Sequence, residues 1–349
     1  MQQLRDADFP AEPYPGATPD VSFVHEDGIG HRLHPDPTRF AGWRVGDKDL
    51  DGWLAEQDAA PLRGRVPVLT YGSNRCPAKI TWLRRAHRLT GPVVVLAANT
   101  ADIAAVWAVG RRARDGQRPA TLAAAPGARE RHSVWLATPE QVEVLDNCEG
   151  RGHRYRLARL RTGTVHTEDG ALVEQPWCYL GLADIRRPLL VDGNPVRCAE
   201  LGQRAARELD GVPADSDGLT ADTAEGAPHP DQWPSALFSY GLLRPGRRGW
   251  PLVAPYAVGD SQPAAATAQV YDTGLGYPAM LLSPPGSAPG TVTYLRNTAR
   301  LLPDLDRFEG PGYRRVRIVL PGAGVVAWAY VWIGAGAGLR SLTDSPGSC

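Results

Sequence analysis

The sequence predicts an α+β protein built from two tandem small mixed β-barrel domains, each flanked by a few helices. Three observations support this fold class: an internal repeat as long as a domain, several short apolar runs that end at glycine, and few amphipathic segments. At 349 residues the chain also exceeds one typical domain. We therefore expect two cores of ordinary size.

The internal repeat consists of short motifs that occur in the same order in both halves of the chain. They are an apolar run ending in Tyr-Gly, a Pro-Ala turn followed by Leu two residues on, and Leu-Asp-x-x-Glu-Gly followed by Tyr-Arg. Because self-similarity over such a length indicates duplication, the repeat predicts two copies of one domain. The copies lie at 69–72, 119–122, 145–150 and 155–156, and at 238–241, 278–281, 305–310 and 313–314.

Composition suggests where the domains begin and end. Residues 1–60 are rich in Pro, Gly and Asp and read as an N-terminal extension, to which we assign no chemistry. Residues 61–210 form the first predicted domain, and the polar, break-rich residues 211–232 are typical of a linker. The second predicted domain covers 233–335, and a C-terminal tail covers 336–349.

Local patterns predict the elements within each copy. Strands are expected where an apolar run ends at glycine or where apolar residues alternate with arginine. Helices are expected where proline precedes an amphipathic segment, and at the end of the first domain. The expected strands are 66–71, 172–180, 236–240, 316–320 and 325–333, and the expected helices are 77–88, 139–147 and 197–209.

Charge and cysteine content narrow the class of partner. Basic and acidic side chains balance at 38 each, which gives no field that would attract nucleic acid or an anionic membrane. The five cysteines are scattered and include no CxxC pair, so neither a disulfide framework nor a metal site is expected. Residues 1–10 lack the pattern of a secretion signal, and no apolar run is long enough to span a bilayer. We expect a cytoplasmic protein with a small-molecule partner and no cofactor; the oligomeric state stays open.

Two features of each copy could carry chemistry. A strand that ends in Tyr-Gly leaves backbone N–H groups free to hold an anion or a developing oxyanion, although the same dipeptide is common in tight structural turns. Glu149 and Glu309 each end a short amphipathic segment, where partial burial would raise the carboxyl pKa and suit proton transfer. A solvated helix-end glutamate is the alternative. Recurrence of the glutamate in both copies favours the catalytic interpretation.

The order of these motifs resembles the γ-glutamylcyclotransferase family in the first copy and the related γ-glutamylamine cyclotransferase branch in the second. The resemblance implies a small mixed β-barrel in which a Tyr-Gly-x-x loop binds the γ-glutamyl moiety and a glutamate acts as acid and base. It implies catalytic roles for Glu149 and Glu309. The implied substrate-binding residues are Tyr71, Gly72, Ser73, Asn74 and Tyr155 in the first copy, and Tyr240, Gly241, Leu242, Leu243 and Tyr313 in the second.

The implied reaction releases 5-oxoproline and a free amine or amino acid from a γ-glutamyl amide through attack by the substrate's own α-amine. Leu242 replaces the Ser or Thr that the family usually carries, so the second loop keeps its backbone donors but lacks a hydroxyl. Two alternatives therefore stay open: a catalytically silent protein that binds a small molecule, and one active domain with a structural partner domain. The amine part of the substrate also stays open. One possibility is a biosynthetic intermediate that carries the γ-glutamyl group as a protecting group.

Overall fold

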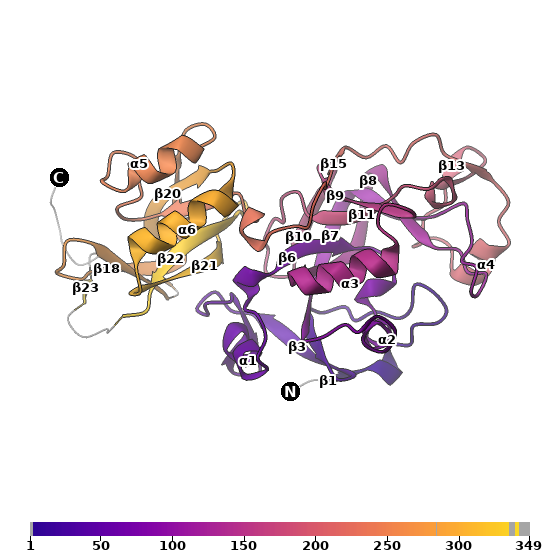
Figure 1. The fold of residues 1–349 in the computed structure, drawn as a ribbon, viewed down its shortest axis with the longest axis horizontal. Helices are drawn as coiled ribbons and strands as arrows, with labels where there is room; N and C mark the ends of the chain where they lie inside the picture. The colour runs from indigo at the N-terminus through magenta and orange to yellow at the C-terminus, as the bar shows by residue number, and fades with distance from the viewer. Residues whose placement is uncertain (1–2, 284, 335–338, 342–349) are drawn as a thin grey trace. The chain divides into compact units, whose positions relative to one another are not determined.

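The computed structural model describes residues 3–283, 285–334 and 339–341 (Figure 1). Most of the tail expected over 336–349 lies outside these described residues. None of the helices in the described ranges is long and apolar enough to cross a membrane.

The chain divides into two compact units, and residues 1–60 are shared between them. Within the expected extension, residues 1–33 and 57–59 belong with the first repeat, and residues 34–56 and 60 belong with the second. Unit 1 comprises Met1–Leu33, Gln57–Ala59 and Arg65–Pro228, and unit 2 comprises His34–Glu56, Ala60–Gly64 and His229–Cys349.

Unit 1 is built on one mixed sheet whose strands lie in the order β15-β9-β11-β6-β8-β7-β2-β3. Strands β6 and β11 are parallel, and the other neighbours are antiparallel. Two further strands join this sheet, β1 beside β3 and β10 beside β7, and β13-β12-β14 form a small second sheet. The strands are β1 (Gln3–Arg5), β2 (Phe23–Glu26), β3 (Ile29–Pro35), β6 (Val66–Thr70), β7 (Val93–Trp107), β8 (Ala120–Ala137), β9 (Tyr155–Leu160), β10 (Thr164–Thr167), β11 (Trp177–Gly181), β12 (Leu189–Val191), β13 (Asn194–Pro195), β14 (Val212–Pro213) and β15 (Ala221–Thr223).

The helices of unit 1 are α2 (Pro77–His87), α3 (Pro139–Glu149) and α4 (Gln203–Arg207). Helix α3 has clear sequence signals at both ends. Thr138 and Gln141 form a capping box at its start, and Gly150 ends it with a φ of 68°, in the left-handed region that glycine tolerates best. These caps fix where the helix stops, and therefore where Glu149 lies.

Unit 2 contains a mixed sheet in the order β17-β20-β16-β22-β21 and a smaller sheet, β19-β18-β23. Its helices are α1 (Leu50–Glu56), α5 (Trp250–Val253) and α6 (Thr298–Glu309). Its strands are β4 (Trp43–Val45), β5 (Lys48–Asp49), β16 (Ala236–Ser239), β17 (Gln262–Ala266), β18 (Ala268–Asp272), β19 (Pro278–Leu282), β20 (Ala288–Tyr294), β21 (Tyr313–Val319), β22 (Val326–Trp332) and β23 (Arg340–Ser341).

The two units share a central topology. The order β9-β11-β6-β8-β7 in unit 1 corresponds to β21-β22-β16-β20-β17 in unit 2, and the parallel pair occupies the same place in both. The mixed α+β class is thus confirmed. No sheet in the described part of the chain closes on itself, because β17 and β21 each pair on one side only in unit 2. The barrel part of the prediction is therefore not confirmed.

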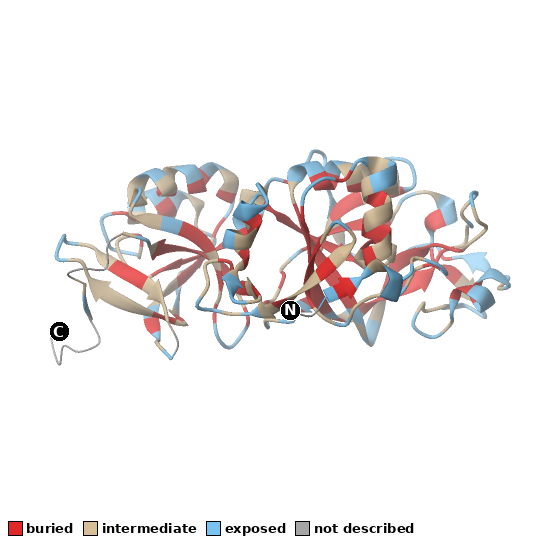
Figure 2. Ribbon diagram, turned by 90° about the horizontal axis from the view of Figure 1, so that it is seen from below, coloured by how far each residue is buried: buried red, intermediate tan, exposed pale blue. Residues whose placement is uncertain are grey.

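Hydrophobic cores lie on the strands and on the inward faces of the helices, and Figure 2 shows buried residues concentrated along the strands. Helices α3 and α6 bury equivalent leucines, Leu145 and Leu305, which are fully buried. Both helices carry exposed and half-buried residues at the same positions. The repeated motif is therefore an amphipathic helix that packs in the same orientation in each unit.

Two predicted elements differ from the structure. Helix α4 begins at Gln203 rather than at residue 197, because Cys198 donates a backbone hydrogen bond to Ala105 at the edge of β7. The strand expected over 172–180 begins only at Trp177, because Gln175 takes a left-handed φ of 48° just before it. The helices expected at 77–88 and 139–147 are confirmed.

Candidate active site

The first Tyr-Gly loop joins the end of β6 to the start of α2. Tyr71 directs its hydroxyl away from the loop and donates a hydrogen bond to the carbonyl oxygen of Tyr179 on β11, 2.5 Å away. Tyr179 in turn donates to Oδ1 of Asp146 on α3, at 2.6 Å. These two phenols therefore anchor the loop to the sheet and the sheet to the helix.

Glu149 is the last residue of α3, and its carboxylate contacts the first Tyr-Gly loop. Asn74 donates a hydrogen bond from Nδ2 to Oε1 of Glu149 over 2.7 Å. Desolvation raises the pKa of Glu149, while this hydrogen bond and the positive charge of Lys79 act in the opposite direction. The position at a helix C-terminus also disfavours the ionised carboxylate. A glutamate with a raised pKa beside a binding loop is suited to accept and return a proton.

The predicted binding residues of the first copy all line one cavity of about 430 Å³. The phenol of Tyr155 forms part of its wall and donates to the carbonyl oxygen of Ala120, 3.2 Å away. The cavity thus joins three motifs that are distant in sequence: the Tyr-Gly loop, the Pro-Ala turn and the helix-end glutamate. Its predicted lining residues are Tyr71, Gly72, Ser73, Asn74, Glu149 and Tyr155.

Positive charge surrounds this carboxylate. Lys79 is only 8% exposed, and its Nζ lies 3.4 Å from the centroid of the Trp82 ring. Arg186, 6% exposed, is the second buried cation in the wall, and it lies over the Tyr155 ring. Glu149 is the single carboxylate among the residues that line the cavity in the described part of unit 1. The cavity therefore suits a ligand with negative charge.

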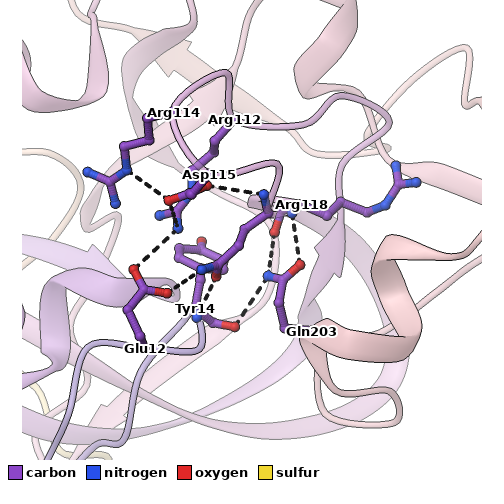
Figure 3. Close-up of polar contacts among 8 residues, drawn as sticks. Glu12, Tyr14, Arg112, Arg114, Asp115, Arg118 and Gln203 are labelled. Atoms are coloured by element: carbon purple, nitrogen blue, oxygen red, sulfur yellow. Dashed lines mark hydrogen bonds and ion pairs between the residues drawn. The ribbon is translucent and has the colours of Figure 1, made fainter.

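The structure also places Tyr14 in the cavity wall, which the sequence analysis did not anticipate. This residue comes from the N-terminal segment and is 8% exposed. Its hydroxyl accepts a hydrogen bond from the backbone nitrogen of Ala120 over 3.0 Å. Figure 3 shows Tyr14 among polar residues of unit 1: the Arg112 guanidinium lies over its ring, and Gln203 donates to its backbone carbonyl oxygen.

Unit 2 repeats the anchoring contacts of unit 1. Tyr240 donates to the carbonyl oxygen of Tyr330 over 2.9 Å, and Tyr330 donates to Oδ1 of Asp306 over 2.8 Å. Tyr313 donates to the carbonyl oxygen of Pro278 over 2.6 Å. The same three phenols thus join loop, sheet and helix in both units.

The second set of predicted residues lines a smaller cavity of about 150 Å³. Desolvation raises the pKa of Glu309 to about 7, so this carboxyl exchanges its proton near neutrality. Aromatic side chains form much of the wall, and Arg248 is the single cation among its lining residues in the described part of unit 2. The predicted residues in this wall are Tyr240, Gly241, Leu242, Leu243, Glu309 and Tyr313.

Sequence reasoning missed the anchoring pair Tyr179 and Tyr330, although a signal for them exists. Trp177-Cys178-Tyr179 and Trp328-Ala329-Tyr330 share a Trp-x-Tyr pattern in equivalent strands. A tyrosine at the same place in both copies would have indicated a repeated polar contact. Tyr14 has no such counterpart, so no repeat could have revealed it.

Comparison with known families gives a match within the second unit. Residues 237–345 match the family model described as "Gamma-glutamyl cyclotransferase, AIG2-like". The match includes the second Tyr-Gly loop and Glu309. A search among curated proteins finds no match for this chain.

The solved structures that the chain matches are distant in sequence. YkqA from Bacillus subtilis shares 21% identity over 32% of this chain and 38% of its own, with a TM-score of 0.26. An AIG2-like protein from Mus musculus shares 16% over 32% of this chain and 88% of its own, with a TM-score of 0.28. A structure described as "Gamma-glutamyl cyclotransferase" shares 17% over 46% of this chain and 94% of its own, also with a TM-score of 0.28.

Proposed function

We propose that the protein is a γ-glutamyl cyclotransferase that converts a γ-glutamyl amide into 5-oxoproline and a free amine or amino acid. The observation that supports this most is a helix-end glutamate with a raised pKa beside a Tyr-Gly loop, found in both units. The family match over residues 237–345 supports the same reaction class for unit 2.

The proposed reaction needs one proton-transfer group because the nucleophile is part of the substrate. Glu149 or Glu309 takes a proton from the α-ammonium, and the freed amine attacks the γ-carbonyl carbon. Backbone N–H groups of the Tyr-Gly loop hold the oxyanion that forms. When the bond to the departing amine breaks, the glutamate gives its proton to that amine, then takes the second proton of the attacking nitrogen and passes it to the freed amine. The five-membered lactam leaves as 5-oxoproline. Enforced folding of the substrate supplies proximity, worth effective molarities of about 10⁵ M or more.

The two cavities favour different amine parts. Lys79 and Arg186 in unit 1 favour an amine part that carries a carboxylate, as in a γ-glutamyl amino acid or peptide. The narrower, aromatic cavity of unit 2 favours a less charged amine. We propose a small-molecule substrate in the cytoplasm and a reaction that uses no cofactor.

The test uses the full chain with a panel of γ-glutamyl dipeptides and γ-glutamyl alkylamines, with 5-oxoproline as the measured product. The double variant Glu149→Gln/Glu309→Gln is expected to lose at least about 100-fold in rate, because an amide cannot transfer the proton. No 5-oxoproline from any member of the panel, or full activity in the double variant, would contradict the proposal.

One active domain with a structural partner is the second candidate. It is supported by the apolar Leu242-Leu243 loop and the small cavity of unit 2, which give the second glutamate fewer polar neighbours. The single variants Glu149→Gln and Glu309→Gln decide between the candidates. Loss confined to one variant across the whole panel identifies the working unit, whereas losses on different substrates indicate two active units.

A further inference from the structure

The N-terminal segment folds into a closed loop against the first Tyr-Gly loop. Ala17 donates a backbone hydrogen bond to Pro10 over 2.9 Å, and the thiol of Cys76 lies 3.2 Å from the carbonyl oxygen of Phe9. Gly16 has a φ of 87°, and a Cβ there would lie 3.0 Å from the Cys76 sulfur. These contacts hold the N-terminal segment beside the first Tyr-Gly loop of unit 1.

Tyr14 lies within this N-terminal loop, and both its backbone and its ring make contacts with other residues of unit 1. Its backbone nitrogen donates to Oε1 of Gln117 over 2.7 Å, and its carbonyl oxygen accepts from Nε2 of Gln203 over 3.3 Å. The guanidinium carbon of Arg112 lies 4.8 Å from the ring centroid, and the Trp107 ring lies 6.3 Å away. Figure 3 shows Tyr14 with Arg112 and Gln203 beside it. Side chains of binding sites are typically held in one position by surrounding contacts of this kind.

The hydroxyl of Tyr14 lies between two of the motifs that form the cavity. It accepts a hydrogen bond from the backbone nitrogen of Ala120, and a Cβ built on Gly72 would stand 2.8 Å from its oxygen. A phenol has one hydrogen to donate, and the bond from Ala120 uses only a lone pair. Burial raises the pKa of Tyr14, so the hydroxyl keeps that hydrogen at neutral pH. A donor is therefore available beside the binding loop.

Unit 2 has an apolar group at the equivalent place. A Cβ on Gly241 would lie 2.8 Å from Cγ of Pro278, so a proline ring covers the second loop where a phenol covers the first. The glycine is needed in both units because another group approaches it closely. The chemical nature of that group differs, and only unit 1 gains a hydrogen-bond donor from it.

We propose that Tyr14 is a substrate-binding residue of unit 1, whose hydroxyl donates a hydrogen bond to an oxygen of the bound γ-glutamyl group. The N-terminal segment is then part of the active site of unit 1. The inference rests on the proposed function, since it takes the cavity around Glu149 as the site of the γ-glutamyl group.

The test compares Tyr14→Phe with its parent in full-length Glu309→Gln protein, so that unit 1 alone contributes to turnover. Loss of one hydrogen bond to a charged oxygen is expected to lower kcat/KM by about 10- to 100-fold. A fall in kcat indicates that the bond forms to the oxyanion, and a rise in KM indicates the α-carboxylate. Tyr271→Phe is the matched control, because Tyr271 bonds to Gln269 and does not line either cavity. Unchanged kcat/KM in Tyr14→Phe would overturn the inference.

A second substitution separates donation to substrate from support of Ala120. 3-Fluorotyrosine at position 14 is a stronger hydrogen-bond donor and a weaker acceptor than tyrosine. If Tyr14 donates to the substrate, this protein keeps kcat/KM within about threefold of the parent. If Tyr14 only accepts from Ala120, the fluorinated protein loses activity together with Tyr14→Phe, and the inference fails.

Calorimetry with 5-oxoproline distinguishes failure of the inference from failure of the proposed reaction. If the Glu309→Gln protein forms no product but binds 5-oxoproline about tenfold more tightly than the same protein carrying Tyr14→Phe, the inference holds and turnover in unit 1 fails. Equal affinities, or no binding by either protein, would overturn the inference as well.

Discussion

Asn74 and Glu149 form the contact that most clearly separates the two sites: the amide Nδ2 donates to the carboxylate over 2.7 Å. The second loop places Leu243 at the corresponding position, and that leucine is 4% exposed. A neutral amide that donates to a carboxylate stabilises the ionised form, whereas a buried leucine cannot. The hydrogen bond from Asn74 therefore acts to lower the pKa of Glu149 against the effect of burial, whereas Leu243 gives Glu309 no such donor.

Replacing Asn74 by leucine is expected to raise the pKa of Glu149 further, because the ionised carboxylate loses a donor. The base form is needed to deprotonate the substrate, so the ascending limb of the kcat/KM profile moves to higher pH. We expect a loss of about tenfold in kcat/KM on the acid side of the profile and a smaller loss on the alkaline side, measured in Glu309→Gln protein. A limb that stays in place would show that the hydrogen bond does not set this pKa.

The reciprocal change, Leu243→Asn in Glu149→Gln protein, tests the same relation in unit 2. An amide near Glu309 is expected to lower its pKa from about 7, since it gives the carboxylate a donor. The ascending limb of any unit 2 activity should then move to lower pH. The matched control is Leu243→Met, which keeps the apolar surface and should leave the limb unchanged.

Lys79 is expected to select substrates whose amine part carries a carboxylate. Lys79→Met should raise KM for a γ-glutamyl amino acid by roughly tenfold relative to a γ-glutamyl alkylamine. Loss of this positive charge also raises the pKa of Glu149, but that effect is common to both substrates and cancels in the ratio. Lys48, the other lysine in the chain, is exposed and paired with Glu56, so Lys48→Met is the control. An unchanged ratio would contradict the role of Lys79.

The repeat explains how much of the site was predictable from the sequence. Residues that recur in both copies, such as Glu149 and Glu309, could be grouped because two independent segments carry the same spacing. Tyr14 and Ala120 are joined across more than a hundred positions by the fold alone, and Tyr14 has no partner in the second copy. No local pattern predicts such a contact.

The fold shows a similar limit. Periodicity predicted α3 and the short strand β6, because caps and apolar runs are local properties. Closure of a sheet into a barrel depends on whether two edge strands pair, and side-chain alternation is the same for paired and unpaired edges. Among the residues that the structure describes, β17 and β21 each pair with a single neighbour, which the sequence pattern could not show.

Tyr179→Phe is expected to destabilise unit 1 by about 2 kcal/mol, because it removes a hydrogen bond to a carboxylate in a partly buried contact. Asp146 keeps its ion pair with Arg151, at 3.0 Å, so it is not left without a partner. Tyr330→Phe is the matched change in unit 2 and should have a similar cost. Denaturant unfolding measures both, and no change in either variant would show that these phenols do not anchor the helices.

Glu309 should make unit 2 less stable as the pH rises. Burial raises the folded pKa of Glu309 to about 7, above the unfolded value of about 4.3. Between these values the folded state binds a proton that the unfolded state has released, so stability falls with rising pH and levels off above about pH 7. The total loss corresponds to roughly 3 kcal/mol.

Glu309→Gln removes this titration and replaces a protonated carboxyl by a neutral group of similar shape. The variant should therefore exceed the parent in stability at pH 8, and the difference should shrink as the pH falls toward 5. Equal stabilities of Glu309→Gln and parent from pH 5 to 8, in thermal or denaturant unfolding, would mean that Glu309 is as well solvated in the folded chain as in the unfolded one. It would then be ionised at neutral pH and poorly suited to return a proton to the leaving amine.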